Sequence, residues 1–201
     1  MASLGRYKSL VLASASPRRA GLLRQVTAIP FSIIKADVDE DIFFEKLPPQ
    51  EAVVKASIEK AVFAAGLFRS SLIIAADTVI VCDGTIMRKP SDISEAREML
   101  IGLRSRVHTV LTGLSVIGRR GISSDIVATE VEMRSFSDTE LDLYLASGEP
   151  FDKAGAYAIQ GRGALLVKRV CGCYYNIVGL PLARLEEMLL ENEVTLLRND
   201  L

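Results

Sequence analysis

The chain has little histidine, no tryptophan, almost no net charge and no long hydrophobic run. Its 201 residues include one histidine and three cysteines, and the formal net charge at pH 7 is -1. Domains with a broad nucleic-acid-binding surface are usually strongly basic, so no nucleic-acid partner is expected. No apolar run approaches the roughly 20 residues that span a bilayer, so no membrane partner is expected either.

The number and spacing of the cysteines argue against two kinds of stabilising site. Cys82, Cys171 and Cys173 form an odd number without a CxxC pair, so neither a disulfide framework nor a zinc site is expected. Free thiols are typical of a reducing compartment, and the predicted location is the cytoplasm. The apolar stretch at 10–13 is shorter than the roughly 7 to 15 residues that a signal peptide needs, and we interpret it as a core strand.

The chain is rich enough in apolar residues to form a sizeable core. Hydrophobic residues make up 49% and charged residues 24%, which predicts a single domain over residues 1–201. We expect strands at 9–13, 72–76, 79–82, 85–87, 107–117 and 125–136, and a strand from 31 that runs into an acidic loop by 41. We expect helices after Ser16 and at 50–68, 91–103, 137–148 and about 181–191, and a hairpin around Gly172. Early alternation of strands and helices with adjacent strands in the middle predicts an α/β fold with a mixed sheet.

The first candidate site follows the strand at 9–13. Ser14 and Ser16 stand before Pro17, which begins a helix with Arg18 and Arg19 in its first turn. The N-terminus of a helix is positive, so two arginines are unfavourable there unless an anion lies nearby; free N–H groups and the serine hydroxyls could bind a phosphate. A P-loop pattern is absent. The alternative is a capped helix with two solvated arginines, which this stretch alone slightly favours.

The second candidate is Asp77, which directly follows an apolar run. A carboxylate at the end of a buried strand lies near the rim of the sheet, where α/β proteins bind ligands, and it could hold Mg²⁺ or activate a water molecule. The alternative is that Asp77 and Thr78 only cap a bend. That alternative is weaker, because burying an idle charge is costly.

Three further stretches have both a functional and a structural interpretation. Lys89 precedes a proline in a stiff loop and could contact phosphate, or it is an ordinary surface lysine. The acidic stretch 37–41 could bind Mg²⁺ or be solvated. The glycine-rich stretch 152–163 carries Gln160, whose amide can read a base edge, or it is a plain surface loop. His108 lies in an alternating strand and is interpreted as structural.

Together these stretches resemble the Maf family of nucleoside triphosphate pyrophosphatases nearly end to end. The matching motifs follow in order: "LASASPRR" (12–19), "DVDED" (37–41), "IEKA" (58–61), "AADTVI" (75–80), "KP" (89–90), "HTVLTG" (108–113), "DKAGAYAIQG" (152–161) and "NIVGLPL" (176–182). The resemblance implies an elongated mixed central sheet with helices on both sides and a cleft between two lobes, related to the inosine triphosphate pyrophosphatases. It also implies a homodimer.

The resemblance assigns a catalytic cluster to four charged residues: Glu40, Lys60, Asp77 and Lys89. Asp77 is the implied general base, and Asp77 with Glu40 would hold a divalent cation, Mg²⁺ or Mn²⁺. Lys60 is chosen over Lys55 because of its "EKA" context, and the choice of Glu40 leaves its acidic neighbours as alternatives.

A second set of residues is implied to bind the nucleoside triphosphate. Ser14, Arg18 and Arg19 would hold the triphosphate, and Arg18, Thr78 and Gln160 match positions associated with base selectivity. The implied reaction converts a nucleoside triphosphate and water to the monophosphate and pyrophosphate, and "AYAIQG" resembles the branch that acts on dTTP and UTP. Two alternatives stay open: the same chemistry on 7-methyl-GTP or another modified nucleotide, and a nucleotide-binding regulator of cell division and septum formation. The intact catalytic set favours an enzyme.

Overall fold

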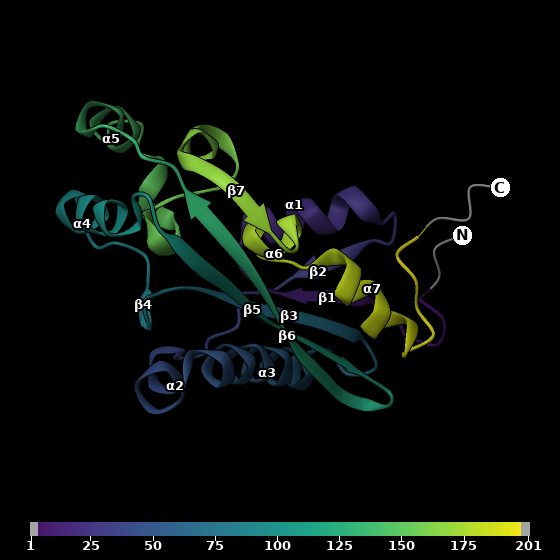
Figure 1. Cartoon of the computed structure of the whole chain (residues 1–201). Coiled ribbons are helices and arrows are strands. Elements are labelled where there is room, and N and C mark those ends of the chain that lie inside the picture. Colours follow the sequence, from purple (N-terminus) through teal and green to yellow (C-terminus); the bar gives the residue numbers. More distant parts are fainter. Residues whose placement is uncertain (1–3, 198–201) are drawn as a thin grey trace. The chain divides into compact units, whose positions relative to one another are not determined.

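The computed structural model describes residues 4–197 and contains a mixed, 7-stranded sheet with the strand order β2-β1-β3-β5-β6-β7, in which β4 pairs with β3 (Figure 1). β1 (Leu10–Ala13) runs parallel to both β2 (Phe31–Ile33) and β3 (Leu72–Cys82). β3 and β4 (Thr85–Met87) pair antiparallel, as do β6 (Gly121–Met133) and β7 (Val167–Cys171). The predicted α/β class with a mixed sheet is confirmed.

The chain divides into two compact units, and three of the four divisions fall within long strands, whereas the fourth falls after Val178. Unit 1 consists of the described residues within Met1–Asp77, Thr112–Val127 and Gly179–Leu201, and unit 2 consists of Thr78–Leu111 and Ala128–Val178. β3, β5 (Val107–Gly118) and β6 each contribute residues to both units. The single domain and the cleft between lobes stay predictions.

Unit 1 is built around β1, whose four residues are all fully buried. A parallel strand that is covered on both faces is expected to be a continuous apolar run, and "LVLA" is one. The helices of this unit are α1 (Pro17–Val26), α2 (Asp41–Lys46), α3 (Pro49–Leu67) and α7 (Leu182–Leu190). Ala61 and Ala64 of α3 pack into one apolar cluster with β1 and β3, so this helix lies directly on the sheet.

α3 approaches the sheet so closely that a glycine is required opposite it. A Cβ added at Gly113 of β5 would lie 2.3 Å from the carbonyl oxygen of Val53 in α3, far inside van der Waals contact. One turn further along α3, the hydroxyl of Ser57 donates to the Val54 carbonyl and lies 2.7 Å from the hydroxyl of Ser115 in β5. These contacts fix the height of α3 above the sheet.

Unit 2 contains α4 (Ile93–Leu103), α5 (Asp138–Leu145), three short 3₁₀ segments, β7 and α6 (Tyr174–Val178). The predicted capping box of Ser137 and Glu140 is confirmed. The one predicted at Asp92 and Glu95 is half formed: Asp92 accepts from the Glu95 N–H, but the Glu95 carboxylate accepts from Ser91 instead.

Of the two predicted hairpins, the one at Asp83-Gly84 is confirmed and the one around Gly172 is wrong. Asp83 and Gly84 both have positive φ between β3 and β4, as a two-residue hairpin requires. The predicted hairpin around Gly172 is wrong, because β7 leads into α6 there. Gly172 has a φ of +127° and packs against Thr129. The glycine therefore allows the backbone to lie close to Thr129 in β6 and does not reverse a strand.

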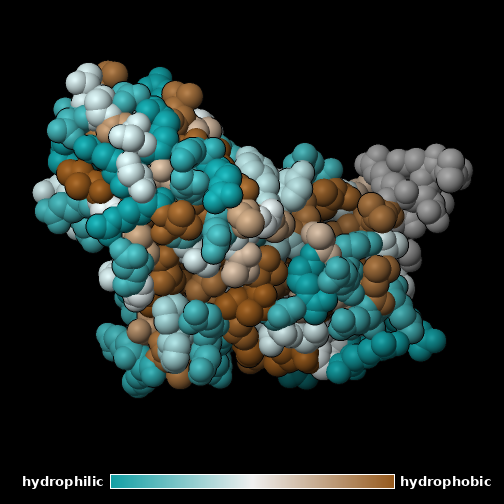
Figure 2. Space-filling view, in the orientation of Figure 1, coloured by the Kyte–Doolittle hydropathy of each residue, from teal (hydrophilic) through white to brown (hydrophobic). Residues whose placement is uncertain are grey.

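The surface is mixed in character. The space-filling view shows hydrophilic residues over much of the visible face, with apolar residues between them (Figure 2). Among the described residues, no helix is long and apolar enough to cross a membrane.

Candidate active site

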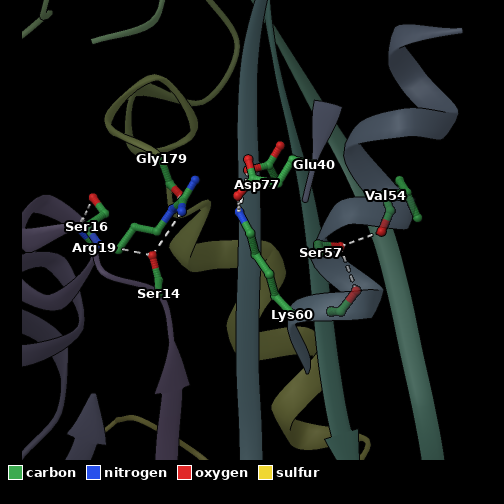
Figure 3. Close-up of polar contacts among 10 residues, drawn as sticks. Ser14, Ser16, Arg19, Glu40, Val54, Ser57, Lys60, Asp77 and Gly179 are labelled. Atoms are coloured by element: carbon green, nitrogen blue, oxygen red, sulfur yellow. Dashed lines mark hydrogen bonds and ion pairs between the residues drawn. The ribbon is translucent and has the colours of Figure 1, made fainter. Parts of the chain in front are cut away.

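Three of the predicted catalytic residues meet in unit 1 around one ammonium group. Lys60 Nζ lies 2.7 Å from Asp77 Oδ1 and 2.5 Å from Glu40 Oε1 (Figure 3). Lys60 and Asp77 are buried, at 7% and 5% exposure. Buried charges are stable only when they are paired, and here the Lys60 ammonium forms ion pairs with two carboxylates.

Each member of this cluster comes from a different element. Lys60 lies on the buried face of α3, and Glu40 is the residue directly before α2. The residue pattern predicts an acidic loop up to Asp41 and no helix after it, so α2 is an addition to the predicted elements. The predicted strand end after Ala76 is wrong: β3 continues through Asp77 to Cys82. Asp77 is therefore held inside a strand, where the ladder fixes its direction, instead of on a flexible rim.

The electrostatics of the cluster favour additional positive charge. Burial raises the pKa of the Glu40 carboxyl, and the charge of Asp77 raises it further, while Lys60 lowers it. The Lys60 ammonium lies within 2.7 Å of both carboxylates and offsets only one of their two charges. A further cation close to the pair would stabilise the ionised form of Glu40.

The loop between β1 and α1 is organised by Arg19. Its Nε donates to the Gly179 carbonyl at 2.7 Å, and its Nη1 donates to the Ser14 hydroxyl at 3.0 Å (Figure 3). Ser16 caps α1 by accepting from the Arg19 N–H, and Pro17 follows in the first turn, as predicted. The alternative of two solvated arginines is wrong for Arg19, which is only 9% exposed.

The charge of Arg19 is compensated within the protein. Burial lowers the pKa of Arg19, while the charges of Asp77 and Glu40 oppose that shift. The anion that the sequence pattern required near the start of α1 is thus supplied in part by the protein's own carboxylates. Arg18, next to it, is half-buried. The contact with Gly179, 160 residues away, was missed by residue-level reasoning; its only signal was the motif "NIVGLPL".

The remaining predicted residues belong to unit 2. Thr78 is half-buried in β3, whereas Lys89 and Gln160 are exposed. The loop that carries Lys89 is joined to the glycine-rich stretch, because the Gly155 N–H donates to the Arg88 carbonyl at 3.0 Å. Gly155 has a φ of +67°, and a Cβ there would lie 2.8 Å from Ile80, so this join needs a glycine.

His108 is buried in unit 2, in agreement with its interpretation as structural. Its Nε2 lies 2.7 Å from the Tyr157 hydroxyl, and among the described residues its Nδ1 has no hydrogen-bond partner. Burial lowers the pKa of His108 to about 4. The ring is therefore neutral in the folded protein near pH 7.

Acid is expected to destabilise the protein through His108. The folded pKa is about 4, below the unfolded value of about 6.5, so the unfolded chain binds more protons between these values and stability falls as the pH falls through this window. The expected loss between about pH 7 and about pH 4.5 is about 2 to 3 kcal/mol. Urea unfolding of the wild type and His108→Asn at both pH values measures it; identical losses in the two proteins contradict the assignment.

Comparison with known proteins identifies the family. The chain matches the family described as Maf-like protein over residues 9–192. A dTTP/UTP pyrophosphatase from Dictyoglomus thermophilum is 45% identical over 184 residues, which cover 90% of this chain and 95% of that protein. The protein of the same name from Halalkalibacterium halodurans is 47% identical over 177 residues, which cover 88% and 92% of the two chains.

Similarity to solved structures is weaker. A HAM1 protein from Coxiella burnetii aligns at 15% identity with a TM-score of 0.42, over 62% of this chain and 72% of that one, which is too low for a conclusion. The match to the family extends over the stretches that carry Ser14, Glu40, Lys60 and Asp77. The chain belongs to the Maf family.

Proposed function

We propose that this protein is a nucleoside triphosphate pyrophosphatase that hydrolyses dTTP and UTP to the monophosphate and pyrophosphate. The observation that carries the proposal is the buried Lys60 that binds both Asp77 and Glu40. The names of the relatives at 44 to 47% identity support the choice of nucleotides.

The proposed reaction is an attack of water on the α-phosphorus. The new P–O bond forms as the bond to the β-phosphate oxygen breaks, and one proton leaves the attacking water. Asp77, whose Oδ1 is held by Lys60, receives that proton at its carboxylate. Arg18 and Lys89 neutralise the triphosphate, so positioning and charge neutralisation supply most of the catalysis.

We further propose that Glu40 and Asp77 hold a divalent cation, Mg²⁺ or Mn²⁺. The pair fits such a cation, because each carboxylate places an oxygen within 2.7 Å of one point, the Lys60 Nζ, where a positive charge already lies. No group of three or more His, Cys, Asp or Glu among residues 4–197 is arranged to hold a metal, so water and phosphate oxygens would complete the shell, as is usual for Mg²⁺. When bound, the cation would neutralise charge on phosphate oxygens.

The test measures products from dTTP, UTP, 7-methyl-GTP and purine triphosphates with Mg²⁺ and with EDTA. Pyrophosphate is expected without orthophosphate, and ¹⁸O from labelled water is expected in the monophosphate alone. Binding of Mn²⁺, followed by its EPR signal with a non-hydrolysable dTTP analogue, is expected to weaken in Asp77→Asn. Orthophosphate as the first product, or full activity in EDTA, contradicts the mechanism.

A cytoplasmic homodimer remains part of the proposal. The resemblance to the family implied the dimer, and the location rests on three free cysteines, Cys82, Cys171 and Cys173. Light scattering coupled to size-exclusion chromatography measures the oligomeric state.

Arg18→Ala is expected to raise KM for dTTP by about 10- to 150-fold, the equivalent of one charge-assisted hydrogen bond. Stability is expected to hold or rise, because a cation leaves the positive end of α1. The matched control is Arg24→Ala in the last turn of the same helix, over the Phe31 ring, which should lower stability slightly and leave KM unchanged. A protein that melts earlier with an unchanged KM would show that Arg18 is structural.

A further inference from the structure

Gln160 lies at the tip of a tightly closed loop in unit 2. We call residues 158–163 the Gln160 loop. Its two ends touch: a Cβ added at Gly163 would lie 2.3 Å from the Ala158 carbonyl oxygen and 3.0 Å from the Ala158 nitrogen. Gln160 is exposed, and Gly161 turns the chain with a φ of +73°. The backbone is thus compact at its base and presents one amide side chain at its tip.

Both ends of this loop are fastened to two side chains of the preceding segment. Glu149 accepts hydrogen bonds from the Arg162 N–H and the Gly163 N–H, each at 3.0 Å. The Tyr144 hydroxyl accepts from the Ala158 N–H at 3.3 Å and donates to Glu149 Oε1 at 3.2 Å. One half-buried carboxylate and one buried phenol therefore hold the backbone on either side of Gln160.

The chemistry of this clamp suits a positioning role. Hydrogen bonds from backbone N–H groups to a carboxylate are stronger than neutral ones, so Glu149 restrains the loop more firmly than an amide could. The carboxylate also packs against the turn, because a Cβ at Gly161 would lie 2.7 Å from Glu149 Oε2. A base-reading amide binds its base more tightly when its backbone is already fixed, because ordering the backbone on binding reduces affinity.

We propose that Glu149, supported by Tyr144, is a positioning residue for base selection. It holds the Gln160 loop in the conformation in which the Gln160 amide meets the edge of a pyrimidine base. The proposal rests on the proposed function, because it takes Gln160 as the residue that reads the base. Glu149 itself touches no reacting atom, so its effect should appear in KM and in nucleotide preference, and not in kcat.

The principal test is Glu149→Gln, which keeps the shape but turns an NH₂ group toward a backbone donor. KM for dTTP and UTP is expected to rise by about 10-fold, the equivalent of about one hydrogen bond, with kcat within about 2-fold of the wild type. The preference for dTTP over purine triphosphates should fall by a similar factor. Hydrogen exchange of the Arg162 and Gly163 amides, measured without nucleotide, should accelerate. Tyr144→Phe should change the same quantities less, and it keeps the test available if Glu149→Gln folds poorly.

Two controls separate positioning from a general loss of structure. Glu140→Ala removes a carboxylate that caps α5 and pairs with Arg134, so it should lower stability without changing KM or preference. In the double variant, Glu149→Gln should add little to the loss of preference caused by Gln160→Ala, because both act through one amide.

The outcomes distinguish this assignment from the function on which it rests. An active wild type with unchanged KM and preference in Glu149→Gln overturns the positioning role alone, as does full additivity with Gln160→Ala. A wild type that releases no pyrophosphate from dTTP or UTP overturns the proposed function and this assignment together.

Discussion

Asp77→Asn is expected to lower kcat for dTTP by at least about 100-fold, the contribution of a general base. Asparagine keeps the shape of the side chain in β3 and still accepts a hydrogen bond from Lys60, but it cannot take a proton from water. Because Lys60 keeps Glu40 as a partner, the fold should be retained. Steady-state kinetics and thermal melting measure the two effects.

The matched control for Asp77 is Asp125→Asn, which also lies in unit 1 and pairs with Arg184. This pair is partly exposed, so its loss should change stability little and kcat not at all. Near-normal turnover in Asp77→Asn, with the fold intact, would assign Asp77 to a structural role and remove the general base from the mechanism.

Lys60→Met is expected to reduce kcat by about 100- to 1000-fold, the usual effect of removing one preorganised group that stabilises charge. Methionine fills the buried volume but leaves Asp77 and Glu40 facing each other without the ammonium. The pKa of Glu40, already raised by burial and by Asp77, should rise further, because Lys60 is the group that lowers it. The acid limb of the kcat/KM profile should therefore move to higher pH.

The raised pKa of Glu40 should also make the stability of Lys60→Met depend on pH. A carboxyl whose folded pKa lies above its unfolded value stabilises the fold at low pH, and that stabilisation is lost as the pH rises through the folded pKa. The variant should be least stable at neutral pH and recover toward acid. The control is Lys55→Met on the same helix, whose pair with Glu59 is exposed and worth little. Unchanged acid limbs in both variants would show that Lys60 does not control Glu40.

The sequence correctly predicts the local features that depend only on residues adjacent in the chain. The buried run of β1, the Ser16 cap with Pro17, and the Asp83-Gly84 turn each depend on adjacent residues, and each is present. The sequence predicts a strand end before the polar Asp77, but β3 continues past it, because the pairing of Asp77 with Lys60 allows a charge inside the sheet.

The candidate site itself depends on contacts that no local pattern contains. Lys60 meets Asp77 across 17 residues, and Arg19 meets Gly179 across 160. Residue-level reasoning could propose each loop as a phosphate or metal site but could not bring them together. Only the ordered set of motifs, through its resemblance to a family, placed Glu40, Lys60 and Asp77 in one cluster.

The anchor of Arg19 has a consequence for the order in which the site is made during translation. Glu40, Lys60 and Asp77 leave the ribosome before Gly179, whose carbonyl binds Arg19 and which belongs to a later segment of unit 1. A nascent chain therefore holds all three charged residues of the cluster well before it can fix the loop beside them. A chain that stops before Gly179 carries the three charged groups without the contact that anchors Arg19 beside them.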